Sequence, residues 1–192
     1  MSFAKIYTRG LLGLHAPLIE VEVHLSHGLA SLTIVGLAEA AVRESKDRVR
    51  SAIINSGFQF PTKRLTINLA PADLPKDGSR LDLPIALGIL IASGQLPEQA
   101  AEQLEFIGEL ALDGHLRPVS GTLSIAIACQ HAQHQLILPE QNAQEAAQLP
   151  DFAVFAAKHL KDVCEHLRQT APLAQYAAPG SSDMPGCRFD LA

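Results

Sequence analysis

The sequence lacks any long apolar run. None of the unbroken hydrophobic stretches in its 192 residues approaches the ~20 residues that a membrane-spanning helix needs. The N-terminal residues, MSFAKIYTRG, contain no apolar signal core. The formal net charge of −5 argues against a basic nucleic-acid-binding protein as a whole, although a local basic patch stays compatible with it. We therefore expect a soluble, cytoplasmic protein without a membrane partner.

The sequence has few cysteines, and they lie far apart along the chain. The three cysteines, Cys129, Cys164 and Cys187, form no CxxC pair, which favours reduced structural thiols over a zinc or redox site. His131 and His134 are three residues apart, but no carboxylate or cysteine accompanies them at the usual ligand spacing. Neither a metal nor a cofactor is expected in this chain.

Three catalytic motifs are absent. The chain has no GxxxxGK[ST] phosphate-binding loop and no GxGxxG after a predicted strand. It also has no GxSxG nucleophile elbow. ATP hydrolysis by this chain alone and the usual serine-hydrolase arrangement are therefore not expected.

Apolar residues make up 47% of the chain, enough for a sizeable core. Alternating residues predict strands over 2–8, 18–25 and 31–37, which we expect to form an antiparallel meander with one solvated face. A 3- to 4-residue apolar spacing predicts a helix over 38–55, followed by a strand over 63–69 and a buried helix over 81–92.

The second half alternates helices and strands. We expect a hairpin around Asp113-Gly114, with a strand on each side within 106–119. Helices are predicted over 120–133, 140–148 and 158–168, with strands over 135–138 and 153–156. The predicted fold class is α+β with a mixed sheet. Residues 1–169 would form this domain, and residues 170–192, rich in Ala, Pro, Gly and Ser, are interpreted as a linker.

Basic residues concentrate in one segment. Residues 43–80 hold eight Lys or Arg against four Asp or Glu, a charge of +4, whereas the rest of the chain has seven against sixteen, a charge of −9. These cations could merge into one surface for phosphates or an acidic partner, or they could be ordinary solvated charges. Phe58 and Phe60 are nearly the only aromatic residues among them, so base stacking looks weak. The eight candidates are Arg43, Lys46, Arg48, Arg50, Lys63, Arg64, Lys76 and Arg80.

The loop Pro71–Pro84, PADLPKDGSRLDLP, is the most unusual segment. Gly78 would allow close backbone approach, and the N–H groups entering the next helix could meet an anion. The alternative is a solvated turn whose Asp and Ser side chains cap that helix.

Two stretches resemble a known family. VEVHLSHGLASLTIVGLAEAAVRESKDRVRSAIINSGFQFPTKRLTINLAPADLPKDGSRLDLPIALGILIASGQL and FIGELALDGHLRPVSGTLSIAIA are similar to the N-terminal region of the ComM/YifB proteins, bacterial AAA+ ATPases often labelled magnesium-chelatase-like. The resemblance covers about residues 3–168. It implies a Lon-protease-domain-like fold that precedes an AAA+ module, with ATP and Mg²⁺ bound in that absent module.

The same segments resemble the Lon protease domain, whose catalytic residues are a Ser–Lys dyad. We can therefore ask whether this chain keeps that serine and that lysine. In Lon the lysine, its pKa lowered by burial, takes the serine proton. The serine lies in a PKDGxSxG-like loop, which places Arg80 at the serine position, Ser79 one residue early and Asp82 at the following glycine. The GEIxLxGxVxPVGGxKEK-like segment places Leu123 at the lysine position. Both dyad residues are therefore replaced, and the altered loop is expected to hold an ion pair or to contact a partner.

The resemblance implies a non-enzymatic accessory domain of a hexameric motor. Its partners would be its own AAA+ domain, neighbouring subunits and DNA, in branch migration during natural transformation and recombination. Two alternatives remain at this point. One is a hydrolase with a rebuilt site that uses Ser79 with Lys76 or Asp77, and the other is a role related to magnesium-chelatase.

Overall fold

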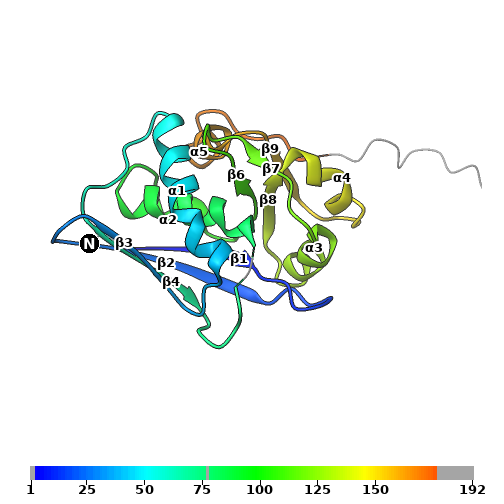
Figure 1. Ribbon diagram of the computed structural model, residues 1–192. Coiled ribbons are helices and arrows are strands. Elements are labelled where there is room, and N and C mark those ends of the chain that lie inside the picture. The colour runs from blue at the N-terminus through cyan, green and yellow to red at the C-terminus, as the bar shows by residue number, and fades with distance from the viewer. Residues whose placement is uncertain (1–2, 77, 177–192) are drawn as a thin grey trace, which may run out of the picture.

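Seven strands form a single mixed sheet in the computed structural model, which describes residues 3–76 and 78–176. The strand order is β3-β4-β2-β1-β5-β8-β9, beside a separate hairpin, β6-β7 (Figure 1). The α+β class with a mixed sheet is confirmed. The strands span Phe3–Arg9 (β1), Leu18–Ser26 (β2), Ser31–Val35 (β3), Arg64–Ala70 (β4), Leu104–Phe106 (β5), Glu109–Leu110 (β6), Leu116–Arg117 (β7), Gln135–Pro139 (β8) and Val154–Ala157 (β9).

Five α-helices lie within the described residues, and four of them have ends close to those predicted from periodicity, whereas the helix predicted over 140–148 is a 3-10 turn followed by a four-residue helix. The predicted hairpin is confirmed, and Gly114 takes the positive φ of 93° that its turn requires. Its first strand is shorter than expected, because Phe106 ends β5 of the main sheet instead. The helices span Ala40–Asn55 (α1), Asp82–Ala92 (α2), Thr122–His131 (α3), Ala143–Ala146 (α4) and Leu160–Leu167 (α5), with 3-10 turns at Ser79–Leu81 (η1), Glu98–Ala101 (η2) and Glu140–Asn142 (η3).

The predicted meander of the first three strands is wrong. β1 and β2 do pair antiparallel, but β3 does not follow them in the sheet. Instead β4 pairs antiparallel with β2, and β3 adds parallel to β4 on the outside. The reason is the helix between them: β3, α1 and β4 form a crossover unit, and a helical crossover joins parallel strands.

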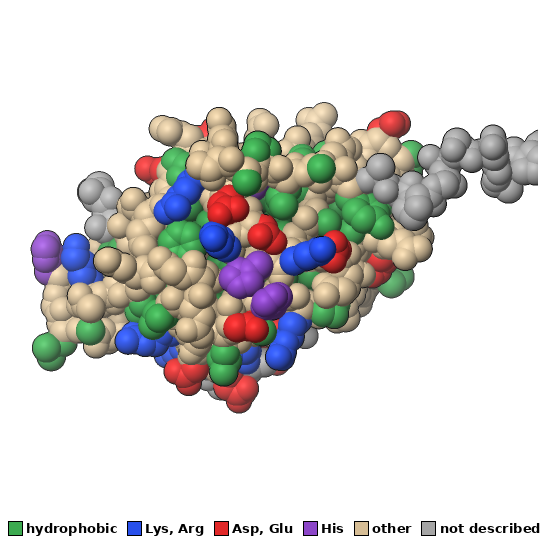
Figure 2. Space-filling view, turned by 90° about the horizontal axis from the view of Figure 1, so that it is seen from above, with side chains coloured by type: hydrophobic (Ala, Val, Ile, Leu, Met, Phe, Trp, Pro, Cys, Tyr) green, Lys and Arg blue, Asp and Glu red, His purple; other side chains and the backbone are tan. Residues whose placement is uncertain are grey.

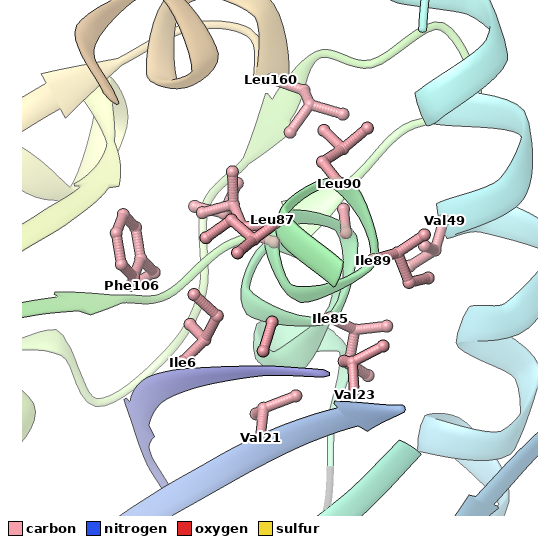
Figure 3. Close-up of a cluster of buried hydrophobic side chains, with 14 of the residues drawn as sticks. Ile6, Val21, Val23, Val49, Ile85, Leu87, Ile89, Leu90, Phe106 and Leu160 are labelled. Atoms are coloured by element: carbon pink, nitrogen blue, oxygen red, sulfur yellow. The ribbon is translucent and has the colours of Figure 1, made fainter. Parts of the chain in front are cut away.

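Helix α2 is the centre of the main core. All eleven of its residues are buried, which fits a helix that is apolar on every side. Figure 3 shows Ile6, Val21 and Val23 of the sheet on one side of α2, with Val49 of α1 and Leu160 of α5 on others. A Cβ added at Gly88 would lie 2.6 Å from a methyl carbon of Val23, so glycine permits this close approach.

The β8–β9 half of the sheet is covered on both faces. Ile137 of β8 faces the main core, whereas its neighbours Leu136 and Leu138 face a second cluster formed with α3 and α4. The unbroken apolar sequence of β8, QLILP, is typical of a strand buried on both sides. The β1–β4 half has α1 and α2 on one face only (Figure 1), which fits the alternating sequence of β2.

Residues 170–176 pack against the domain. The backbone N–H of Tyr176 donates to the Val154 carbonyl oxygen at 2.7 Å, and Gln175 bridges to Phe155 on the outer side of β9. The remainder of the predicted linker, residues 177–192, lies outside the described residues. In the described part of the chain, no helix is long and apolar enough to cross a membrane.

The two described cysteines are buried thiols. Cys129 and Cys164 are free, and burial raises the pKa of the Cys164 thiol to about 12 and the pKa of the Cys129 thiol still further. Thiols of this kind are poor nucleophiles at neutral pH, which supports the structural role expected of them. Cys187 lies outside the described residues.

Candidate functional site

The loop that resembles the protease nucleophile loop is fixed to the segment between β3 and α1. Lys76 pairs with Ala38 in an isolated parallel bridge, and its carbonyl oxygen accepts the Glu39 N–H at 3.1 Å. The chain then passes Gly78, whose φ is 77°, and enters η1 and α2. These bonds hold the start of α2 beside α1 and β6.

Arg80, which the Lon resemblance places at the serine position, is buried, with 7% of its surface exposed. Its guanidinium lies close to Gly78, with Nη2 3.6 Å from where a Cβ of residue 78 would be. Its carbonyl oxygen accepts the Gly108 N–H at 3.0 Å, which joins the loop to the strand before the hairpin. If the resemblance holds at this position, a buried guanidinium takes the place of the nucleophile hydroxyl, and an always-charged arginine cannot act as a nucleophile.

Asp82 forms an ion pair with Arg48 of α1, a residue that the sequence analysis grouped with the candidate surface cations. The Arg48 Nε and Nη2 atoms donate to the two carboxylate oxygens at 2.8 and 3.2 Å, and the Leu110 N–H donates at 3.2 Å. Asp82 is fully buried, and this burial raises the pKa of its carboxyl to about 6 against the opposing effect of Arg48. The contact joins α1, α2 and β6.

Ser79 lies next to Arg80 but does not contact Lys76. Its hydroxyl donates to the Glu109 carboxylate, which also lies 3.4 Å from Nη1 of Arg117. The Lys76 ammonium instead donates to the Pro71 carbonyl oxygen, and burial lowers its pKa. Ser79 and Lys76 each have a different hydrogen-bond partner, so this geometry does not form the Ser79–Lys76 version of the hydrolase alternative, and Asp77, the other partner considered for Ser79, lies outside the described residues.

Leu123 is half-buried in the first turn of α3, at the position of the dyad lysine. Its backbone N–H donates to the Glu145 carboxylate at 3.0 Å. The sequence contains no lysine between Lys76 and Lys158, so no lysine stands near Leu123 along the chain. The site has a serine with a carboxylate partner, a buried guanidinium and no general-base amine at the dyad position.

The eight candidate cations do not share one surface. Lys46 donates to the Leu32 carbonyl oxygen at 2.9 Å, and Arg48 binds Asp82. Lys76 and Arg80 are buried, with 1% and 7% of their surfaces exposed. The cations with exposed side chains are Arg50, Lys63 and Arg64, and the side chain of Arg43 lies outside the described part of the structure.

The exposed cations gather near the start of β3. Arg50 and Lys63 line the same small cavity, and Arg50 lies over the Phe60 ring, 4.7 Å from its centroid. Arg64 begins β4 opposite Ser31, and its Nε lies 3.9 Å from where a Cβ of Gly28 would be. Elsewhere, on the face drawn in Figure 2, basic, acidic and histidine side chains lie interspersed, without a large area of one charge sign.

Sequence reasoning missed three residues. Glu109 was part of the quoted GELALDG segment, yet no role was assigned to it. Arg48 was grouped with the surface cations, although Asp82 follows it by 34 residues and pairs with it. Phe60 entered only the argument that aromatic residues are too few for base stacking, yet its ring lies under the Arg50 guanidinium. One signal in the sequence could have indicated the Arg48 contact. Asp82 stands at the start of a helix predicted to be buried, and a buried carboxylate needs a cation as partner.

No metal site is evident in residues 3–76 and 78–176, where no group of three or more His, Cys, Asp or Glu side chains is arranged to hold an ion. His134, one of the two closely spaced histidines, has its Nδ1 atom 2.9 Å from the buried Glu105 carboxylate. That carboxylate also binds Arg9 through two hydrogen bonds of 2.7 and 2.6 Å. These residues form a buried ion-pair cluster.

Comparison with known proteins gives the chain a set of relatives. Residues 21–142 match the family model described as subunit ChlI of Mg-chelatase. The chain is 49% identical over 176 residues to "Competence protein ComM" of Haemophilus influenzae and 51% identical over 179 residues to "Uncharacterized protein YifB" of Salmonella typhimurium. Each alignment covers 91% of this chain and 35% of the relative, so the chain spans about a third of their length. A distant similarity, 22% identity over 179 residues, links 85% of the chain to 21% of the Lon protease of Azorhizobium caulinodans.

Proposed function

The chain belongs to the family described as subunit ChlI of Mg-chelatase, and from this membership we propose that it is a non-catalytic accessory domain. It would form the N-terminal part of a ComM-like AAA+ protein that acts in natural transformation and recombination. Its role there is to assist ring assembly or to contact DNA. The similarity to the N-terminal third of ComM supports this proposal.

One observation carries the non-catalytic part of the proposal. Both positions that resemble the Lon dyad hold residues without the needed chemistry, Arg80 in place of serine and Leu123 in place of lysine. The Arg48–Asp82 pair, with the Leu110 N–H, joins α1, α2 and β6 beside this loop. A loop fixed by buried charges favours a scaffold over a catalytic centre that must admit a peptide.

ATP and Mg²⁺ do not fit this chain. The sequence has no phosphate-binding loop of the GxxxxGK[ST] type, and the described residues offer no cluster of metal ligands. We therefore assign ATP binding and hydrolysis to the AAA+ part that the longer ComM-like relatives would carry outside the matched third, and no step of the proposed role passes through a bound metal.

The test compares the full-length protein with a version that lacks residues 1–169. Three quantities are measured: hexamer formation by sedimentation velocity, ATP hydrolysis, and branch migration of forked DNA. We expect ATP hydrolysis to persist in the shortened protein while assembly or branch migration falls. Unchanged assembly and unchanged branch migration would refute the accessory role.

Two further assays address the alternatives. A serine-reactive phosphonate probe is expected to leave the chain unlabelled, whereas labelling that is lost in Ser79→Ala would establish a hydrolase. A magnesium-chelatase assay on the full-length protein is expected to be negative, and metal insertion into a tetrapyrrole would replace the proposed role.

A further inference from the structure

A small cavity of about 110 Å³ lies away from the degenerate protease-like loop. Three separate elements form it: α1 contributes Arg50, the start of β3 contributes Ser31, and the segment before β4 contributes Phe60 and Lys63. The cavity therefore brings together two cations and a hydroxyl from parts of the chain that are distant in sequence.

Arg50 is held in place before any ligand arrives. Its guanidinium carbon lies 4.7 Å from the centroid of the Phe60 ring, within the range of a cation–π contact. An arginine that lies on an aromatic ring loses rotamer freedom, while the N–H groups at the edge of the guanidinium stay available to a ligand. Binding an anion here costs less conformational entropy than binding it to a mobile side chain.

The two cations are not neutralised internally. In the described part of the chain, neither Arg50, Lys63 nor the adjacent Arg64 forms an ion pair with a carboxylate, whereas Lys5, Arg9, Arg48 and Arg117 all do. The chain as a whole carries a net charge of −5. Unneutralised cations gathered at one point of an acidic protein create a local positive potential, which attracts anions.

The donor set favours a phosphate over a carboxylate. A planar carboxylate is satisfied by the guanidinium fork alone, whereas a phosphate has more oxygens to satisfy. Arg50, Lys63 and Ser31 all line the cavity, and their side chains carry a guanidinium fork, an ammonium and a hydroxyl as hydrogen-bond donors. A second hollow of about 250 Å³ shares Phe60, Pro61 and Lys63 with the first, and it leaves room for the organic group that carries the phosphate.

The wall of that second hollow is rigid. Gln95 binds the backbone of Gln59 in both directions, with its Oε1 accepting the N–H at 2.9 Å and its Nε2 donating to the carbonyl oxygen at 2.8 Å. The segment that carries Phe60 and Lys63 is thereby tied to the end of α2.

We propose that the cavity formed by Ser31, Arg50, Phe60 and Lys63 binds a phosphate group, with Arg50 and Lys63 as its charged contacts. The phosphate is that of a nucleic-acid backbone or of a free nucleotide. This inference deepens the proposed function. It rests on that function only where it names a DNA backbone as the molecule that carries the phosphate.

The experiment titrates the 192-residue chain with three probes: a 20-residue oligothymidylate, thymidine monophosphate, and poly-L-glutamate. Binding is followed by fluorescence anisotropy with a labelled oligonucleotide and by competition with the other two. We expect oligonucleotide affinity to fall steeply with salt, because phosphate contacts release counterions. Competition by thymidine monophosphate at the same site would identify a free nucleotide as the source, and its absence would identify the backbone.

The variants are Arg50→Ala, Lys63→Ala and Arg50→Lys, with Lys161→Ala as the matched control. Lys161 is a surface cation of α5 that pairs with Glu165 and does not line the cavity. Arg50→Ala and Lys63→Ala are each expected to weaken oligonucleotide binding about tenfold and to reduce the salt slope by about 1. Arg50→Lys keeps the charge but loses the fork, so it should weaken binding less than Arg50→Ala.

Three results would overturn the proposal: equal binding by wild type and both alanine variants, an equal loss in Lys161→Ala, or displacement of the labelled oligonucleotide by poly-L-glutamate as effective as by unlabelled oligothymidylate. The outcome is separate from that of the proposed function. If deletion of residues 1–169 impairs branch migration while Arg50→Ala binds normally, only the phosphate site fails. If the deletion has no effect while Arg50→Ala loses binding, the accessory role fails and the site stands.

Discussion

Two arginines of α1 stand two residues apart and lie in opposite environments. Arg48 faces the start of α2 and binds the fully buried Asp82 carboxylate through two hydrogen bonds. Arg50 is exposed and lies over Phe60 at the edge of a small cavity. An α-helix rotates by about 100° per residue. Side chains two residues apart therefore point in directions about 200° apart, to opposite sides of the helix.

The difference separates a structural charge from an available one. The Arg48 guanidinium compensates a buried carboxylate, and a buried charge without a partner costs several kcal/mol. Arg50 compensates nothing inside the protein and stays free to bind a ligand. The charge of the segment 43–80 therefore says little about ligand binding until each cation is assigned to one of these two classes.

The largest expected effect breaks the Arg48–Asp82 pair. Arg48→Ala should lower the free energy of unfolding by about 3–5 kcal/mol at pH 7.5, because Asp82 is then left buried without its guanidinium. Arg50→Ala should lower it by at most about 1 kcal/mol, the loss of an exposed cation–π contact. Urea unfolding of both variants, followed by circular dichroism, measures the two values.

The double variant Arg48→Met/Asp82→Leu is the control for this comparison. Replacing a buried ion pair with apolar residues of similar size is often neutral or stabilising, so it should recover most of the lost stability. Equal destabilisation by Arg48→Ala and Arg50→Ala would show that the two arginines do not differ as described.

A second prediction concerns pH. The folded-state pKa of Asp82, about 6, lies above the value of roughly 3.9 in an unfolded chain. Between those pH values the folded protein holds a proton that the unfolded chain has released. The contribution of Asp82 to stability is therefore fully present below pH ~4 and is lost as the pH rises through 6, with a total of up to about 3 kcal/mol.

Asp82→Asn isolates this contribution, because it keeps the shape of the side chain and removes its titration. The wild type should lose stability relative to Asp82→Asn as the pH rises from 4 to 7, as measured by urea unfolding at several pH values. Parallel pH profiles for the two proteins would contradict the raised pKa. The gap between Arg48→Ala and wild type should also shrink below pH 5, since a protonated Asp82 no longer needs the guanidinium.

Local elements were predictable from the sequence because they depend on near neighbours in the chain. The alternation of β2, the apolar helix α2 and the Asp113-Gly114 turn all appear where periodicity placed them. The position of β3 in the sheet was not predictable in this way, because its pairing with β4 across a helix depends on contacts between residues that are distant in the sequence. An antiparallel meander and a crossover unit have the same alternating strands, so the pattern of β3 alone does not distinguish them.

The same distinction applies to the site. The motif comparison indicated which residues stand in place of the dyad, because it depends only on order along the chain. It did not indicate that Glu109 would accept the Ser79 hydroxyl or that Arg48 would reach Asp82, since both contacts join separate elements. Counting charge within a segment likewise grouped buried Lys76 with exposed Lys63, because composition carries no information about burial.

The smallest expected effect is the loss of stability on Ser79→Ala, which tests how far Ser79 contributes to the packing of the degenerate protease-like loop. Ser79→Ala removes a hydrogen bond to Glu109, whose carboxylate still has Arg117 beside it and keeps 26% of its side chain exposed to water. Because no buried group is left without a partner, the free energy of unfolding should fall by only about 1 kcal/mol. Urea unfolding measures this change, with Ser93→Ala as the control, since the Ser93 hydroxyl also donates one local hydrogen bond, to the Leu90 carbonyl oxygen. A loss of 3 kcal/mol or more, as expected for a broken buried ion pair, would show that Ser79 is integrated into the Arg48–Asp82 region rather than placed beside it.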